Sequence, residues 1–218
     1  MDPEFWHERW ETSRIGFHMD AVNPWLVSYW PTLEVGRGDR VFVPLCGKSL
    51  DMLWLLEQGY QVIGVEISQI AVEAFFSENR LEPLTEPAGR FTRWRYDVLE
   101  VLCGDFFDLD ISLLGSLDAT YDRAALIAMP TDMRPRYATH LAGLTERKTR
   151  ELLITLEYNQ LEMAGPPFSV SEDEVNRLFG NNYSVECLAS TDVLDENAKF
   201  RDSGLTLLRE LAYRLTQL

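Results

Sequence analysis

The chain has 218 residues, of which 46% are hydrophobic and 11% aromatic, which is enough apolar material for the core of one α/β domain and excludes a disordered chain. Lysine and arginine together number 20 against 35 aspartate and glutamate residues, so the net charge is −15. No stretch gathers the basic residues into a patch. These features argue against nucleic acid and anionic membranes as partners and leave a small molecule as the expected ligand.

The cysteines and the N-terminus bear on where the protein works. Cys46, Cys103 and Cys187 are too few and too far apart for a disulfide framework or a zinc site, so we expect three reduced thiols and no metal ion. The first residues, MDPEFWHERW, have neither the basic nor the apolar part of a secretory signal, and no run approaches the roughly 18 apolar residues of a membrane span. We therefore expect a cytoplasmic protein.

Residues 1–39 precede the first strand and are rich in aromatic side chains. Trp6 and Trp10 are four positions apart and would share one face of a helix. Pro24, just before the run WLVSYW, is typical of the first turn of a second helix. The simplest interpretation is that this segment covers the core; the alternative is a helical lid over a ligand.

From residue 40 onward, short apolar runs alternate with helical stretches. The predicted strands are 41–45, 61–67, 98–103, 117–126, 150–158, 182–189 and 205–215. The predicted helices are 49–59, 68–79, 133–143 and one that begins at Ser171. A proline-containing connection, 81–89, leads into FTRWRY at 91–96.

This alternation predicts right-handed crossovers and a mostly parallel sheet with helices on both faces. The last two predicted strands are close enough in sequence to pair antiparallel at an edge of the sheet. No repeat, low-complexity tract or linker divides the chain. We therefore expect residues 1–218 to form a single domain, with 40–218 as its α/β core.

Ligands of such sheets bind beyond the carboxyl ends of the strands, so the loops there are the candidate site. The loop after the first strand contains Gly47-Lys48-Ser49, but Phe42 stands where a phosphate-binding loop needs another glycine, and the glycines of the dinucleotide fingerprint are missing too. Glu66 follows Gly47 by about 20 positions, the spacing at which a carboxylate reaches a ribose diol. A nucleoside without a pyrophosphate is the expected ligand; otherwise Glu66 is only a polar strand end.

Two later loops add to this site. Asp105 and Phe106 follow the third strand and could accept a hydrogen bond from an adenine amine and contact its ring, or else Asp105 caps a helix and Phe106 belongs to the core. Arg123 follows the fourth strand and could hold a carboxylate or an anionic substrate in the same crevice. Alternatively, Arg123 forms a structural ion pair with Asp122 or Asp118.

Five stretches of the sequence together closely resemble the thiopurine S-methyltransferase family, most of all its shorter bacterial members. They are FWHERWETSRIGFH (5–18), VFVPLCGKSLDMLWLLEQGYQVIGVEIS (41–68), FFDL (106–109), YDRAALIAMP (121–130) and GPPF (165–168). The resemblance implies the class I methyltransferase fold, which is a Rossmann-like sheet of seven mostly parallel strands with one antiparallel member. It also implies S-adenosyl-L-methionine as cofactor and an N-terminal helical lid over it.

The resemblance also assigns site residues. The positions that match cofactor contacts of the family are Trp10, Leu45, Glu66, Asp105, Phe106 and Arg123. Those that match the substrate side are Phe17, Arg123 and Pro167, with Trp6 in the same aromatic wall. Arg123 is the expected stabiliser of a thiolate, and no dedicated general base is required. Asp105 stands where some members have a small polar residue, and around 195–204 either Lys199 or Arg201 could replace a substrate-side arginine of the animal members.

The expected function is S-adenosylmethionine-dependent S-methylation of aromatic and heterocyclic thiols such as thiopurines, serving detoxification of xenobiotics or of selenium and tellurium. The alternative within this class is methylation of another small-molecule acceptor. From other classes come a nucleotide-responsive binding module without turnover and a dinucleotide-dependent oxidoreductase, and the missing glycines count against the latter. We expect a monomer.

Overall fold

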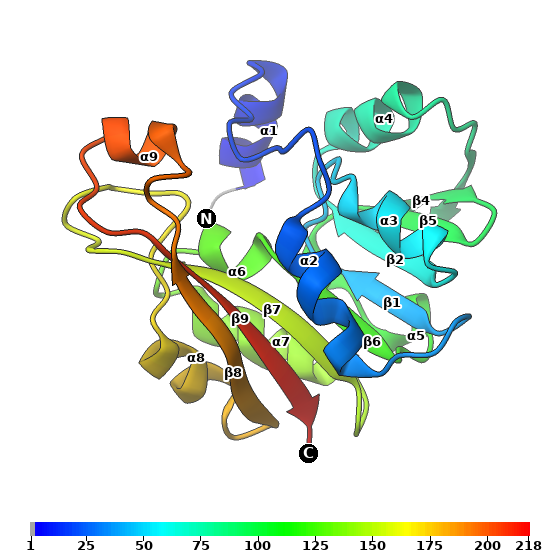
Figure 1. Cartoon of the computed structure of the whole chain (residues 1–218). Coiled ribbons are helices and arrows are strands. Elements are labelled where there is room, and N and C mark those ends of the chain that lie inside the picture. The colour runs from blue at the N-terminus through cyan, green and yellow to red at the C-terminus, as the bar shows by residue number, and fades with distance from the viewer. Residues whose placement is uncertain (1–2) are drawn as a thin grey trace.

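Figure 1 shows the protein as a computed structural model, which describes residues 3–218. The described chain contains one nine-stranded sheet in the order β3-β4-β5-β2-β1-β6-β7-β9-β8. Its five parallel strands are β1 (Arg40–Val43), β2 (Gln61–Glu66), β5 (Leu99–Cys103), β6 (Ala119–Asp122) and β7 (Arg150–Glu157). Its antiparallel pairings involve β3 (Leu84–Ala88), β4 (Phe91–Tyr96), β8 (Tyr183–Asp192) and β9 (Arg209–Gln217).

Helices cover both faces of the sheet, as predicted (Figure 1). One core cluster lies between the sheet and α2 (Pro24–Tyr29), η1 (Trp30–Leu33), α3 (Asp51–Glu57) and α4 (Gln69–Glu78). The other core cluster involves α5 (Ile111–Leu114), α6 (Ala125–Ala128), α7 (Arg134–Leu144) and α8 (Glu172–Phe179). Three further elements are α1 (Pro3–Glu11), η2 (Phe106–Asp108) and α9 (Ala198–Asp202).

The sheet has two strands more than the seven predicted, because the hairpin β3–β4 extends it beyond β5. The sequence predicts a proline-containing connection at 81–89, and Pro87 lies in β3 instead. On an outermost strand, however, proline costs no ladder hydrogen bond. The remaining seven strands match the expected set, with β9 antiparallel between β7 and β8. The helix α6 also ends the strand predicted at 117–126 early, because a short apolar run fits either structure.

The second half of the N-terminal segment is part of the core. Asn23 caps α2, and its side-chain oxygen accepts from the backbone N–H of Trp25 at 2.7 Å. Leu26, Trp30 and Leu33 are at most 2% exposed. Covering the core is therefore the role of this half, and residues 3–20 are the part that lies over the end of the sheet.

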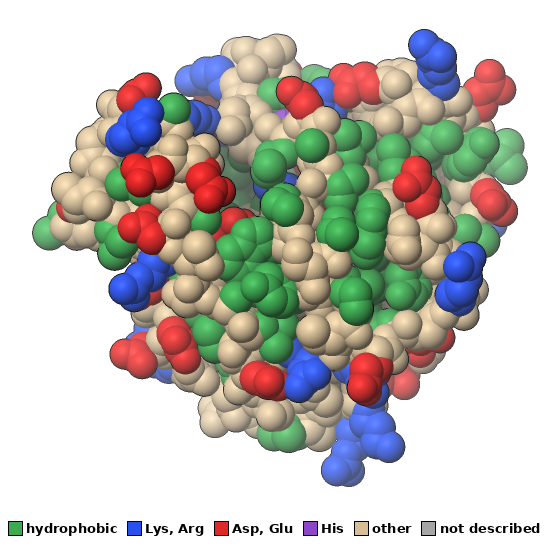
Figure 2. All heavy atoms as spheres, in the orientation of Figure 1, with side chains coloured by type: hydrophobic (Ala, Val, Ile, Leu, Met, Phe, Trp, Pro, Cys, Tyr) green, Lys and Arg blue, Asp and Glu red, His purple; other side chains and the backbone are tan. Residues whose placement is uncertain are grey.

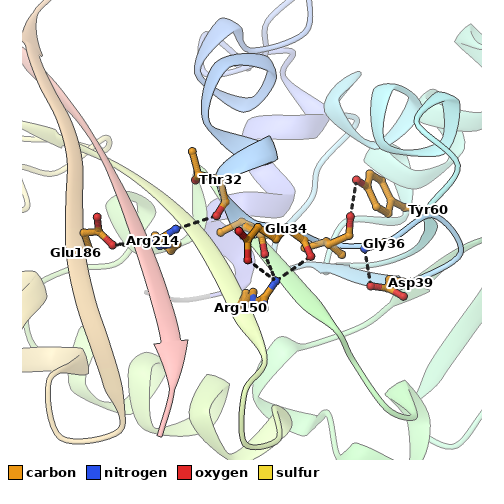
Figure 3. A network of polar contacts seen from close by, with 10 residues as sticks. Thr32, Glu34, Gly36, Asp39, Tyr60, Arg150, Glu186 and Arg214 are labelled. Atoms are coloured by element: carbon orange, nitrogen blue, oxygen red, sulfur yellow. Dashed lines mark hydrogen bonds and ion pairs between the residues drawn. The ribbon is translucent and has the colours of Figure 1, made fainter.

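Figure 3 shows how two arginines fix η1 to the sheet. Arg150 of β7 donates to the Glu34 carbonyl at 2.8 Å, and Arg214 of β9 donates to the Thr32 carbonyl at 2.9 Å. Carbonyls at the end of a helix lack partners inside the helix, so these guanidinium groups satisfy them and interact favourably with the helix dipole. The chain is thereby anchored just before β1.

Two buried carboxyl groups lie on neighbouring strands under α7. Asp122 of β6 accepts from the Tyr137 hydroxyl at 2.6 Å, whereas both carboxyl oxygens of Glu151 on β7 lack any hydrogen-bond partner among the described residues. Burial raises the pKa of Asp122 to about 6. Burial, reinforced by Asp122, raises the pKa of Glu151 well above its usual value. Both influences favour the neutral form of Glu151.

We expect Glu151→Met to stabilise the protein at pH 8 by about 1–3 kcal/mol, the usual cost of an unsatisfied buried polar group. A carboxyl group whose pKa is raised by folding stabilises the folded state fully at pH values below its pKa in the unfolded chain, which is near 4.5. This stabilisation is lost as the pH rises through the pKa of the group in the folded protein. The advantage of the variant should therefore shrink toward pH 4. Urea unfolding of both proteins at pH 4, 6 and 8 measures this difference, and a difference independent of pH would contradict it.

Candidate active site

A cleft opens where the strand order reverses, at the carboxyl ends of β1 and β6. β1 lies between β2 and β6, so the loops that follow β1 and β6 leave in opposite directions and a crevice forms between them. The cavity there holds about 1030 Å³ of empty space, part of it open to solvent. Figure 2 shows this face of the molecule hollowed between α1 and α6. Its lining includes Trp10, Phe17, Leu45, Gly47, Arg123 and Pro167.

A second cavity, of about 640 Å³, adjoins the first beyond the ends of β2 and β5. Leu45, Glu66 and Trp6 line both cavities, and Asp105 and Phe106 line the second. Apart from Lys199 and Arg201, the predicted site residues therefore all lie around one bipartite cleft, with Glu66 where its two halves meet.

Glu66 organises the backbone at this junction. Its side chain, with the residue only 6% exposed, accepts one hydrogen bond from the Gly47 N–H and one from the Ser68 N–H, both at 2.9 Å. Burial raises the pKa of this carboxyl, and the two N–H donors offset part of the effect. Glu66 is thus more than a polar strand end, because it holds the loop after β1 against the start of α4.

Gly47 allows the N-terminal segment to approach this loop closely. Its φ is +53°, and a Cβ at this position would meet the Trp10 ring at 3.3 Å. Trp6 and Trp10 each contact Phe17 edge to face, at centroid distances of 5.7 Å and 5.5 Å. The three predicted aromatic residues therefore form one cluster over the cleft.

Arg123 lies in the cleft, and its ion-pair partner is Asp51 rather than Asp122 or Asp118. Its Nη1 lies 3.6 Å from a carboxylate oxygen of Asp51, and its Nη2 contacts the Met19 sulfur. Asp51 is 1% exposed and also accepts from the Tyr121 hydroxyl at 2.9 Å and from the Asn23 N–H at 2.7 Å. The sequence gives no signal for Asp51 beyond an acidic residue in a first helical turn, because its partners are distant in the chain.

Asp105 and Phe106 take the structural places considered for them, a helix cap and the core, and both also line the second cavity. The Asp105 carboxylate accepts from the Phe107 N–H at 2.9 Å and so caps η2, while the residue lines the second cavity. Phe106 is 4% exposed and its ring packs against Tyr137 at a centroid distance of 5.0 Å, so the ring belongs mainly to the core. The packing of Phe106 in the core therefore determines the shape of this wall of the second cavity.

Lys199 and Arg201 differ in where they point. Lys199 of α9 donates to the Gly16 carbonyl at 3.0 Å and so joins α9 to the segment over the cleft. Arg201 forms an ion pair with Asp202 at 3.9 Å. Neither residue is among those that line the two cavities.

Two negative findings concern residues 3–218. No group of three His, Cys, Asp or Glu side chains in this part of the chain is arranged to hold a metal ion. None of its helices is long and apolar enough to cross a membrane.

Solved structures that share this architecture include methyltransferases. The chain is similar to 1,6-didemethyltoxoflavin-N1-methyltransferase of Burkholderia thailandensis, determined with S-adenosylhomocysteine, with a TM-score of 0.66 and 16% identity over 99% of this chain and 86% of that one. It is equally similar to magnesium protoporphyrin IX methyltransferase of Synechocystis PCC 6803, also with bound S-adenosylhomocysteine, with a TM-score of 0.66 and 15% identity over the full length of both chains. The fold is that of the S-adenosylmethionine-dependent methyltransferases.

Sequence comparison narrows this class to one family. The family model of thiopurine S-methyltransferase matches residues 1–218. A thiopurine S-methyltransferase of Pseudomonas fluorescens (strain Pf0-1) is 50% identical over 215 residues, which cover 99% of each chain. The chain belongs to the thiopurine S-methyltransferase family, and it is a methyltransferase that uses S-adenosyl-L-methionine.

Proposed function

We propose that this enzyme methylates the sulfur atom of aromatic and heterocyclic thiols, thiopurines among them. The observation that carries the proposal is the composition of the first cavity. Trp6, Trp10, Phe17 and Pro167 offer it apolar surfaces that suit a flat ring, and Arg123 adds a guanidinium group beside them. A site of this kind favours a flat acceptor whose reacting atom carries partial or full negative charge.

The bipartite cleft fits the cofactor. The second cavity, with Asp105 and Phe106, would take the adenine, and Glu66 at the junction would accept from the ribose hydroxyls. Trp10 and Leu45 would then cover the amino-acid end in the first cavity. When bound, S-adenosylmethionine supplies a methyl group that is activated by a sulfonium charge.

The residues of this chain would contribute mainly alignment and exclusion of water. The aromatic cluster over the cleft shields the reacting atoms. The Arg123 charge favours the thiolate form of the acceptor. Because Asp51 lies 3.6 Å from Arg123 and offsets part of this charge, we expect the contribution of Arg123 to be moderate.

The proposal is tested by transfer of an isotope-labelled methyl group to four acceptors, namely an aromatic thiol, 6-mercaptopurine, an aliphatic thiol and selenite. Calorimetric titration of S-adenosylhomocysteine accompanies it. Fast turnover of the two aromatic thiols and slow turnover of the aliphatic one is the expected result. Tight binding of S-adenosylhomocysteine without turnover of any thiol would assign another acceptor.

Arg123→Met is expected to lower kcat/KM for 6-mercaptopurine about tenfold, which corresponds to about 1.4 kcal/mol of lost stabilisation. Arg123→Lys keeps the charge without the planar fork and should recover part of this loss. Steady-state kinetics of the two variants measure the loss and its partial recovery. Unchanged turnover and unchanged cofactor affinity in the methionine variant would remove Arg123 from the site.

We further propose that the segment 3–20 is a lid that closes over bound cofactor. Its aromatic cluster lies over the cleft, and Lys199 and Met19 connect it to the rest of the molecule. S-adenosylhomocysteine is then expected to protect this segment from limited proteolysis. Equal cleavage rates with and without the ligand would contradict a lid.

The physiological role that we propose is detoxification, with soft nucleophiles as acceptors. Thiolates and reduced forms of selenium and tellurium share this chemistry, so chalcogen methylation would use the same cleft. The three cysteines are free thiols, which suits the proposed cytoplasmic location. We propose a monomer as the active form, since the bipartite cleft is built from one chain; sedimentation of the pure protein measures this.

A further inference from the structure

His18 lines the first cavity, and its imidazole has no role in the site described above. It follows Phe17 in the segment over the cleft, and its side chain is 14% exposed. Its backbone N–H donates to the Ile15 carbonyl at 2.8 Å, so a tight turn orients the residue. The imidazole therefore stands beside the space that we assign to the acceptor.

The other titratable groups of the same cavity are engaged. Asp51 and Tyr121 bond to each other, and Glu66 accepts two backbone N–H groups. Lys48 forms an ion pair with Glu78 at 2.7 Å. Burial also raises the pKa of the Cys46 thiol, which keeps it protonated. Apart from the protonated Cys46 thiol, the His18 imidazole is, among the described residues that line this cavity, the titratable side chain with no hydrogen bond shorter than 3.5 Å to another residue.

The surroundings of His18 keep it neutral near pH 7. Burial is the largest influence on its pKa and lowers it below 6.5, and Lys48 and Arg123 lower it further. Asp20 on its own segment and Glu78 on α4 act in the opposite direction without reversing the shift. A neutral imidazole has a nitrogen lone pair and can accept a proton.

We propose that His18 is the proton acceptor for thiols that enter the site protonated. The inference rests on the proposed S-methylation. The S–H bond breaks and the proton moves to an imidazole nitrogen. The electron pair left on sulfur forms the new bond to the methyl carbon, while the bond from that carbon to the sulfonium sulfur breaks. The Asp20 carboxylate, 3.7 Å from His18 Nε2 and exposed, then stabilises the imidazolium until the proton leaves to solvent.

The test compares acceptors that differ in ionisation. 4-Nitrothiophenol is a thiolate at pH 7.5, whereas an alkyl thiol is mostly protonated there. We expect His18→Gln to lower kcat for the alkyl thiol about 100-fold, a usual size for general-base catalysis, and to change kcat for 4-nitrothiophenol less than twofold. The loss should shrink as the pH is raised above the pKa of the alkyl thiol.

His7→Gln is the matched control. It makes the same exchange in the same N-terminal segment, at a residue outside the two cavities, and should leave both rates unchanged. Equal losses of His18→Gln on both acceptors would indicate a structural role and overturn the inference, as would no loss on either. Failure of the wild-type enzyme on both acceptors would instead reject the proposed S-methylation.

A measurement without turnover supports the same test. The chain has three histidines, so the imidazole resonance of His18 can be identified by its loss in His18→Gln. We expect this resonance to titrate below pH 6.5 in the free enzyme. We also expect it to shift when an alkyl thiol and S-adenosylhomocysteine are bound together, because the neutral ring then accepts a hydrogen bond from the S–H group. Titration above pH 6.5 without any response to the thiol would count against His18 as the acceptor of the proton.

Discussion

Glu66→Ala is expected to weaken the binding of S-adenosylhomocysteine about 100-fold. Hydrogen bonds to a charged group contribute about 1.5–3 kcal/mol each, and this carboxylate is proposed to accept from the ribose. It also holds the Gly47 N–H and the Ser68 N–H at 2.9 Å, so its removal loosens both loops around the cofactor. Calorimetric titration measures the loss of affinity.

Two further variants separate the causes of this effect. Glu66→Gln keeps the shape of the side chain and one acceptor oxygen, so it should lose less affinity than the alanine variant. Glu73→Ala changes an exposed glutamate on the same helix, α4, and should bind as the wild type does. Wild-type affinity in Glu66→Ala would remove Glu66 from the cofactor site and leave it a structural role.

Asp51→Ala is expected to lower the free energy of unfolding by about 3 kcal/mol. The change leaves the Tyr121 hydroxyl and the Asn23 N–H without their acceptor, at about 1–3 kcal/mol for each buried group. It also leaves Arg123 unpaired, although Arg123 is partly exposed and water reduces that cost. Chemical denaturation at neutral pH measures the loss.

The matched control for Asp51 is Asp20→Ala, because the Asp20 side chain is fully exposed and should contribute almost nothing to stability. Combining Asp51→Ala with Arg123→Met tests the ion pair directly. If the two groups stabilise each other, the double variant should be less destabilised than the sum of the single ones. Additive effects would show that Asp51 acts through Tyr121 and Asn23 alone.

Much of the fold could be predicted because its cause is local. Each parallel strand is a short buried apolar run followed by a helix, and this pattern is visible in the sequence itself. The hairpin β3–β4 was missed because its outer strand is exposed and contains Pro87, so that it carries no apolar pattern. The end of β6 was misplaced because Ala125 and Leu126 are equally apolar in a strand or a helix.

The candidate site likewise contains residues whose positions could be predicted from the sequence and residues whose positions could not. Glu66 and Arg123 could be predicted from their positions at strand ends, where the topology of the sheet brings residues together. Asp51 and Glu151 could not, because what distinguishes them is the set of groups around them in space. Asp51 meets Tyr121 across 70 positions of the sequence, and Glu151 is distinguished only by the lack of a hydrogen-bond partner among the described residues.

The clamp of Arg150 and Arg214 on η1 sets a boundary for movement in the N-terminal segment. Residues that follow this clamp in the sequence cannot move without disturbing the sheet. In front of it, Asn23 caps α2 and donates to Asp51, and the segment 3–20 is joined to the rest of the chain by the Lys199 contact to Gly16 and the Arg123 contact to Met19. The proposed lid would then open by displacement of residues 3–20 around a hinge near Asn23, with loss of these two contacts. Such a lid would let substrate and product pass while the folded core stays intact.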